Sequence, residues 1–201
     1  MFVCVGFPSF PPIAHVMEGL SSIPVENHLN NQYTRGFGHG PFVAALGDFY
    51  GPLFDRKLDV NNEILVTVGA YFSLYAATQG NLPRVNPKKS NPCLALLNPG
   101  DEAIIIEPFF DCYAPMVRYA GGHAKYIPLA PAGEENTAND WKLDMEKLES
   151  LVSPKTKMIF FNNPNNPLGK VYTQEECEGN TIHSEQGALF CPKYHFVVYT
   201  L

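Results

Sequence analysis

Residues 157 to 170 read KMIFFNNPNNPLGK. The apolar residues of this stretch are typical of a strand that is buried on both faces of a sheet. The Asn, Pro and Gly residues that follow favour a rigid turn. In sheets of parallel strands, ligands bind where such turns follow the carboxyl ends of the strands. The stretch therefore predicts a strand over 157–161, followed by a binding loop.

The remaining periodicity predicts alternating helices and strands. Apolar residues recur at helical spacing in four segments and form short β-branched or apolar runs in three more. Such alternation favours an α/β fold with a mostly parallel sheet. The expected helices are 13–20, 43–58, 71–79 and 144–152, and the expected strands besides 157–161 are 63–68, 102–107 and 124–129.

The composition restricts the partners and the compartment. The 201 residues carry a formal net charge of -6, which gives no electrostatic reason to expect nucleic acid or an anionic membrane as a partner. The five cysteines show no C-x-x-C pair, and the histidines are isolated, so no metal site is predicted. No apolar stretch reaches the ~18 residues of a membrane span. We expect a cytoplasmic protein, with mitochondria as the alternative.

Five motifs in order along the chain resemble one enzyme family. They are Gly6-Phe7-Pro8, the segment NQYTRGFG over 31–38, VTVGAY over 66–71, EPFFDCYAPM over 107–116 and NPNNPLGK over 163–170. Together they are similar to the fold-type I, pyridoxal-phosphate-dependent aminotransferases of the kynurenine aminotransferase group, which includes glutamine transaminase K and the cysteine-S-conjugate β-lyases. The resemblance implies the three-layer α-β-α large domain of these transferases, here incomplete.

By this resemblance, four residues contact the cofactor. Asn166 would donate a hydrogen bond to the phenolic O3′ of pyridoxal phosphate, and Phe110 would stack on the pyridine ring. The backbone amides of Ala70 and Tyr71 would bind the phosphate at a helix N-terminus. The family has a small residue where Phe72 stands, which predicts crowding in the first turn of that helix.

The resemblance also implies substrate and subunit contacts. Gly6 would lie beside the substrate carboxylate, and Asn166 would line the same site. Tyr33 would reach the cofactor phosphate of the neighbouring subunit in a homodimer. The alternative for Tyr33 is an aromatic side chain packed in its own loop, and the alternative for Phe109 is a core residue. The substrates would be an amino acid and a 2-oxo acid.

The domain organisation follows from where the resemblance holds. We expect an N-terminal arm and small-domain segment over 1–35 and the first half of the large domain over 36–178. Residues 80–94 contain three prolines and interrupt an expected helix, so they are interpreted as an insertion. Residues 179–201 show no helical period where a helix should continue, and are interpreted as a tail foreign to the family.

The implied reaction is transamination between a kynurenine-like or glutamine-like amino acid and a 2-oxo acid. The family places its Schiff-base lysine beyond the position of residue 178, and no catalytic residue is assigned here. Lys170 is interpreted as a surface or loop residue, and Lys193 has no suitable context. The chain as given is therefore expected to be inactive alone. The alternative is a non-catalytic splice form or gene-model fragment that at most binds a subunit or, weakly, the cofactor.

Overall fold

The computed structural model describes residues 10–79, 96–132, 137–174 and 176, together with the strand residues 183–184, 187–188 and 197–198. Its centre is a four-stranded parallel sheet in the order β2-β1-β5-β8. The strands are β1 (Glu102–Glu107), β2 (His123–Pro128), β5 (Thr156–Asn162) and β8 (Val197–Val198). The expected α/β class with a parallel sheet is confirmed.

The central strand β1 alternates its side chains between two cores. Ala103 and Ile105 belong to one cluster of buried residues, and Ile104 and Ile106 belong to the other. Successive side chains of a strand point to opposite faces, so a run that is apolar at every position needs cover on both sides. The apolar run between two glutamates thus marks a strand buried on both faces, and the strand predicted over 102–107 agrees with β1.

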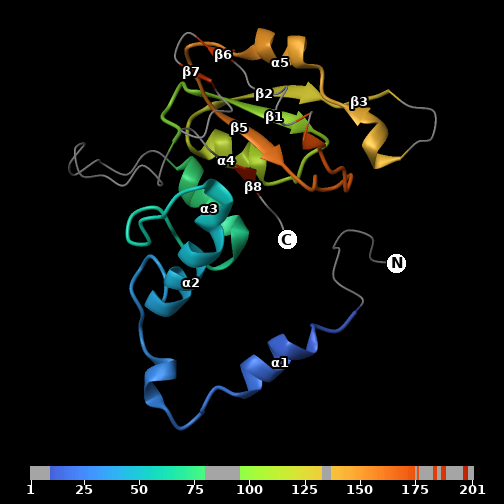
Figure 1. Ribbon diagram of the computed structural model, residues 1–201. Coiled ribbons are helices and arrows are strands. Elements are labelled where there is room, and N and C mark those ends of the chain that lie inside the picture. Colours follow the sequence, from blue (N-terminus) through green and yellow to red (C-terminus); the bar gives the residue numbers. More distant parts are fainter. Residues whose placement is uncertain are drawn as a thin grey trace.

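Helices cover both faces and give three layers. α4 (Tyr113–Tyr119) and part of α3 (Gly69–Thr78) pack on one face, and α5 (Met145–Leu151) packs on the other (Figure 1). α5 begins where the Asp144 side chain accepts a hydrogen bond from the Lys147 amide, 3.0 Å away. An N-cap of this kind satisfies an amide that has no partner inside the helix.

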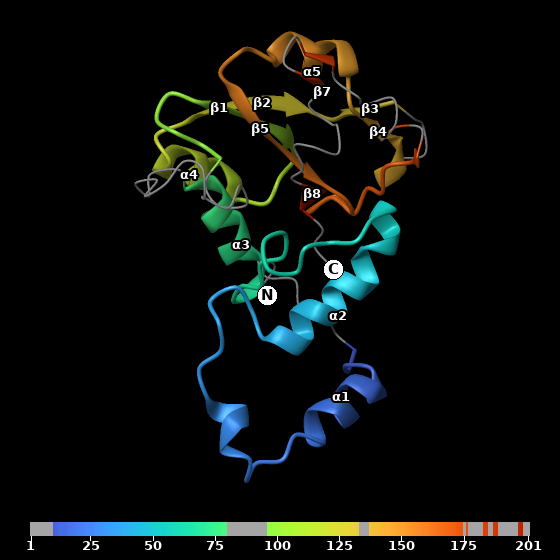
Figure 2. The ribbon, with the colours of Figure 1, turned by 60° about the vertical axis from the view of Figure 1, so that its left-hand side comes forward.

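The N-terminal part extends away from the sheet (Figure 2). It contains α1 (Ala14–Ser21), the 3-10 turn η1 (His28–Asn31), α2 (Gly40–Tyr50) and the 3-10 turn η2 (Pro52–Phe54). α2 ends before the predicted 58 because Pro52 cannot continue the hydrogen-bonding pattern of a helix. No residue of α1 is buried, and Val43 is the buried residue of α2.

The strand expected over 63–68 is wrong. Those residues pair with no strand among the described residues, and the Val66 amide donates to the Phe37 carbonyl at 3.0 Å. A β-branched run becomes a strand only where a neighbouring strand supplies partners. The helix that follows was predicted correctly in type, and it begins at Gly69.

Four short strands form two further antiparallel pairs. β3 (Ala130–Pro131) pairs with β4 (Trp141–Lys142), and β6 (His183–Ser184) pairs with β7 (Gly187–Ala188).

The proposed insertion 80–94 lies outside the described residues, but the segments that precede and follow it are in contact. Gln79 and Leu97 form a parallel bridge, and the Leu96 amide donates to the Ala77 carbonyl at 2.7 Å.

Candidate functional site

The loop after β5 is held by its own side-chain amides. The Asn166 amide donates to Asn162 Oδ1 at 2.7 Å, and Asn165 Oδ1 accepts from the Leu168 amide at 3.1 Å. Asn165 is 5% exposed, whereas Asn166 is half-buried and follows the carboxyl end of β5. Gly169 has φ +70°, a left-handed conformation that favours glycine. The loop therefore presents the Asn166 side chain from a fixed backbone.

The loop after β1 separates two adjacent phenylalanines. Phe109 packs against the core, with its ring 6.2 Å from Tyr113 and 5.8 Å from Tyr126 in stacked arrangements. Phe110 is 38% exposed and meets Tyr113 edge-on at 6.1 Å. Burial raises the pKa of Tyr113 to about 12. Phe109 is thus a partly buried residue that packs against the core, and Phe110 exposes part of its ring at the carboxyl end of β1.

A hydrogen bond joins these two loops. Asn165 Nδ2 donates to the Pro108 carbonyl at 3.3 Å, across 57 residues of sequence. β1 and β5 are neighbours in the sheet, so their carboxyl ends lie side by side. The contact brings the loop of Phe110 and the loop of Asn166 together at the carboxyl ends of two parallel strands, which is where ligands bind in such sheets.

The N-terminus of α3 is open for an anion. No side chain caps it, and Ala70 and Tyr71 in its first turn are exposed. Gly69 has φ +77°, and Thr67 Oγ1 donates to its carbonyl at 2.9 Å while also contacting Ser73 Oγ. The first amides of a helix have no partner within it and carry the positive end of its dipole. This turn fits a phosphate group.

The predicted crowding by Phe72 is not observed. Its side chain is 53% exposed and lies 6.2 Å from the Tyr75 ring in a tilted arrangement.

The structure describes one of the two remaining predicted site residues. Tyr33 is fully exposed, so it is not packed within its own loop. Gly6 lies outside the described residues.

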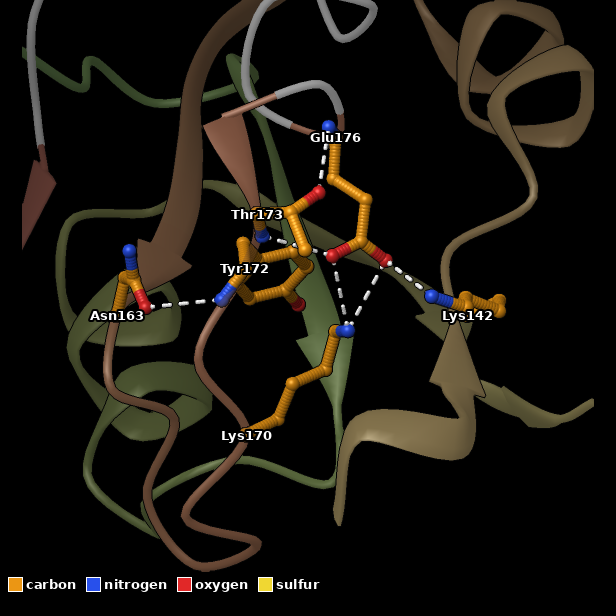
Figure 3. A network of polar contacts seen from close by, with 6 residues as sticks. All are labelled: Lys142, Asn163, Lys170, Tyr172, Thr173 and Glu176. Atoms are coloured by element: carbon orange, nitrogen blue, oxygen red, sulfur yellow. Dashed lines mark hydrogen bonds and ion pairs between the residues drawn. The ribbon is translucent and has the colours of Figure 1, made fainter. Parts of the chain in front are cut away.

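Lys170, interpreted from the sequence as a surface or loop residue, lies in the loop after β5 but is buried, so it is not a surface residue. Its side chain is 1% exposed, and Nζ lies 3.0 Å and 3.2 Å from the two carboxylate oxygens of Glu176 (Figure 3). The ammonium also lies 4.7 Å from the centre of the Tyr172 ring. A buried charge requires such partners. Glu176 was missed at the sequence level, although the spacing Thr173-x-x-Glu176 is that of a capping box.

Comparison with known proteins identifies the family. The family model for aminotransferase class I and II matches residues 1–179. The chain belongs to this family. It is 47% identical over 176 residues to kynurenine–oxoglutarate transaminase 3 of Mus musculus, covering 86% of this chain and 35% of that protein. It is 37% identical over 201 residues to kynurenine–oxoglutarate transaminase 1 of Homo sapiens, covering 96% of this chain and 44% of that protein.

Solved aminotransferase structures share the fold. Bna3p of Saccharomyces cerevisiae superposes with a TM-score of 0.71 at 31% identity, covering 87% of this chain and 38% of that chain. The N-succinyldiaminopimelate aminotransferase of Mycobacterium tuberculosis gives a TM-score of 0.69 at 30% identity, covering 88% and 40%. The chain thus spans less than half the length of the curated relatives it matches.

This family depends on pyridoxal phosphate, and the residues present fit that group. The uncapped α3 N-terminus suits the phosphate, the exposed Phe110 ring suits the pyridine face, and Asn166 supplies a neutral amide. Among the described residues, no group of three or more His, Cys, Asp or Glu could hold a metal ion. No helix of the described segments is long and apolar enough to cross a membrane.

Proposed function

We propose that this chain forms the cofactor-binding first part of an aminotransferase that transfers an amino group from a kynurenine-like or glutamine-like amino acid to a 2-oxo acid. The observation that carries the proposal is the hydrogen bond between Asn165 and the Pro108 carbonyl, at 3.3 Å. It supports a single ligand site at which Phe110 and Asn166 act together. The similarity to kynurenine–oxoglutarate transaminases supports the substrate class.

When bound, pyridoxal phosphate supplies the electron-withdrawing ring on which amino-group transfer depends. Asn166 would donate its side-chain amide to the phenolic oxygen, Phe110 would orient the ring by stacking, and Ala70 and Tyr71 would bind the phosphate through backbone amides. Gly6 would border the substrate carboxylate together with Asn166. The covalent anchor and the proton-transfer base are expected from residues that this chain does not contain.

Tyr33 supports a homodimer. Its ring is fully exposed in the segment between η1 and α2. This segment belongs to the N-terminal part that extends away from the sheet (Figure 2), and aromatic residues are enriched where subunits meet. We propose that Tyr33 contacts the cofactor phosphate of the second subunit.

The test is a titration of the 201-residue chain, and of a longer protein that contains it, with pyridoxal phosphate. Absorbance of the bound cofactor is followed before and after borohydride reduction. We expect saturable binding by both, weakened by Asn166→Ala and Phe110→Ala, and a reduced adduct on one lysine only in the longer protein. If the shorter chain also fixes the cofactor to one lysine, the expectation that it is inactive alone is wrong. If neither protein binds, the proposed site is wrong.

A further inference from the structure

Lys170 is the least exposed charged residue of the described segments, at 0% for the whole residue. The transamination proposed above gives it no task. An isolated buried ammonium is strongly unfavourable, so the position of Lys170 depends on the groups around it. Those groups are the Glu176 carboxylate, at 3.0 Å, and the face of the Tyr172 ring. Lys170 therefore stays inside only while this pair holds.

The Glu176 carboxylate is itself fixed. Oε2 accepts from the Thr173 amide at 2.9 Å, and the Glu176 amide donates to Thr173 Oγ1 at 3.1 Å (Figure 3). These reciprocal bonds form a capping box. Lys142 of β4 adds a second cation 3.2 Å from Oε1. Burial opposes the ionisation of Glu176, but the hydrogen bonds from Thr173, Lys170 and Lys142 outweigh it and hold its pKa below the ordinary value.

The backbone of Lys170 continues into the candidate site. Its carbonyl accepts from the Asn165 amide at 2.8 Å, and the Gly169 amide donates to the Asn165 carbonyl at 2.7 Å. Residues 165–170 thus form a closed ring of backbone contacts. Asn166 is one of the residues of this closed loop and directly follows Asn165, whose amide is bonded to the Lys170 carbonyl. A displacement of Lys170 must therefore move or loosen the Asn166 backbone.

We propose that Lys170 is a positioning residue whose pair with Glu176 fixes the loop that presents Asn166. The inference rests on the proposed function for what Asn166 contacts, but not for the order of the loop. Because its ammonium is enclosed and paired with a carboxylate, Lys170 is held away from the open site and does not bind substrate or cofactor itself.

The test uses Lys170→Met in a full-length protein that contains this sequence. Methionine keeps an apolar stem of similar length and removes the charge. Amide hydrogen exchange is measured by mass spectrometry in peptides that span 163–170 and, for comparison, 102–107. We expect exchange at 163–170 to become about tenfold faster, since local opening follows the loss of local contacts. We expect 102–107 to stay unchanged. The matched control is Lys147→Met, an exposed lysine on α5.

A cofactor titration on the same proteins separates the two proposals. Faster exchange confined to 163–170, with weaker binding of pyridoxal phosphate, supports both the positioning role and the contact of Asn166. Faster exchange with unchanged binding supports the positioning role and overturns the proposed cofactor contact. Exchange equal to that of Lys147→Met, or faster everywhere, overturns the positioning role.

If Lys170→Met fails to fold, the same exchange measurement is made on Lys142→Met. Its side chain is 52% exposed, so its loss leaves the core intact while it removes one of the two cations from Glu176. A smaller acceleration in the same peptide supports the inference, and none overturns it.

Discussion

Replacing Asn165 with alanine tests the link between the two strand-end loops. The side chain makes two hydrogen bonds, accepting from the Leu168 amide at 3.1 Å and donating to the Pro108 carbonyl at 3.3 Å. Each such bond contributes about 1 kcal/mol net. Asn165 is 5% exposed, but both partners are half-buried, so water can replace part of the loss. We therefore expect Asn165→Ala to lower the free energy of unfolding by about 1 to 2 kcal/mol.

Urea denaturation followed by fluorescence measures this change, because Trp141 is the single tryptophan of the 201 residues and packs against the core near α5. The control is Asn139→Ala, an exposed asparagine for which we expect less than ~0.5 kcal/mol. Pyridoxal phosphate should also bind more weakly to Asn165→Ala, since the loops of Phe110 and Asn166 are no longer joined. If Asn165→Ala behaves like the control in both measurements, the loops are not coupled through this residue.

Three further predictions concern the layers around the site. Hydrogen bonds from Lys125 and Ser153 lower the pKa of Glu102, so the stability that this carboxylate contributes above its unfolded pKa is lost as the pH falls through its folded pKa. The melting temperature of Glu102→Gln should therefore depend less on acid pH than that of the unchanged protein. Leu148→Ala, at the fully buried position of α5, should cost about 3 kcal/mol in urea unfolding. Burial, with the charge of Asp111, raises the pKa of the Cys112 thiol to about 11, so it should react with iodoacetamide at pH 8 far more slowly in the folded than in the unfolded protein.

The parts of the fold that the sequence predicts are those with a strong local pattern. β1 is apolar at four successive positions, and α5 begins at a capping aspartate, so both were bounded to within a residue. α4 was not predicted, because Pro115 stands within seven residues that show no obvious helical period. Proline is accepted there because it lies in the first turn, where an amide needs no partner. The hairpin of β3 and β4 escaped prediction because each strand has two residues.

Within the site, the sequence predicts types of residue better than their environments. The motif indicated an amide-bearing loop after β5, but it could not show that Asn165 faces inward while Asn166 stays half-exposed. The burial of Lys170 could not be predicted, because a lysine in a polar loop is usually solvated. Its burial depends on Glu176, six residues away, and Glu176 in turn pairs with Lys142 from another element. Only the folded chain brings these three charges together.

The exposed ring of Phe110 contacts aromatic residues of the core. Phe160 of β5 stacks on Tyr113 of α4 at 4.7 Å, and Tyr113 in turn meets Phe110 edge-on at 6.1 Å. Both Tyr113 and Phe160 are almost fully buried, so their rings have little freedom to turn. Phe110 therefore projects from packed residues on two secondary-structure elements, although it lies in a loop. A ligand ring that stacks on it meets a surface already ordered by the fold, which lowers the entropy lost on binding.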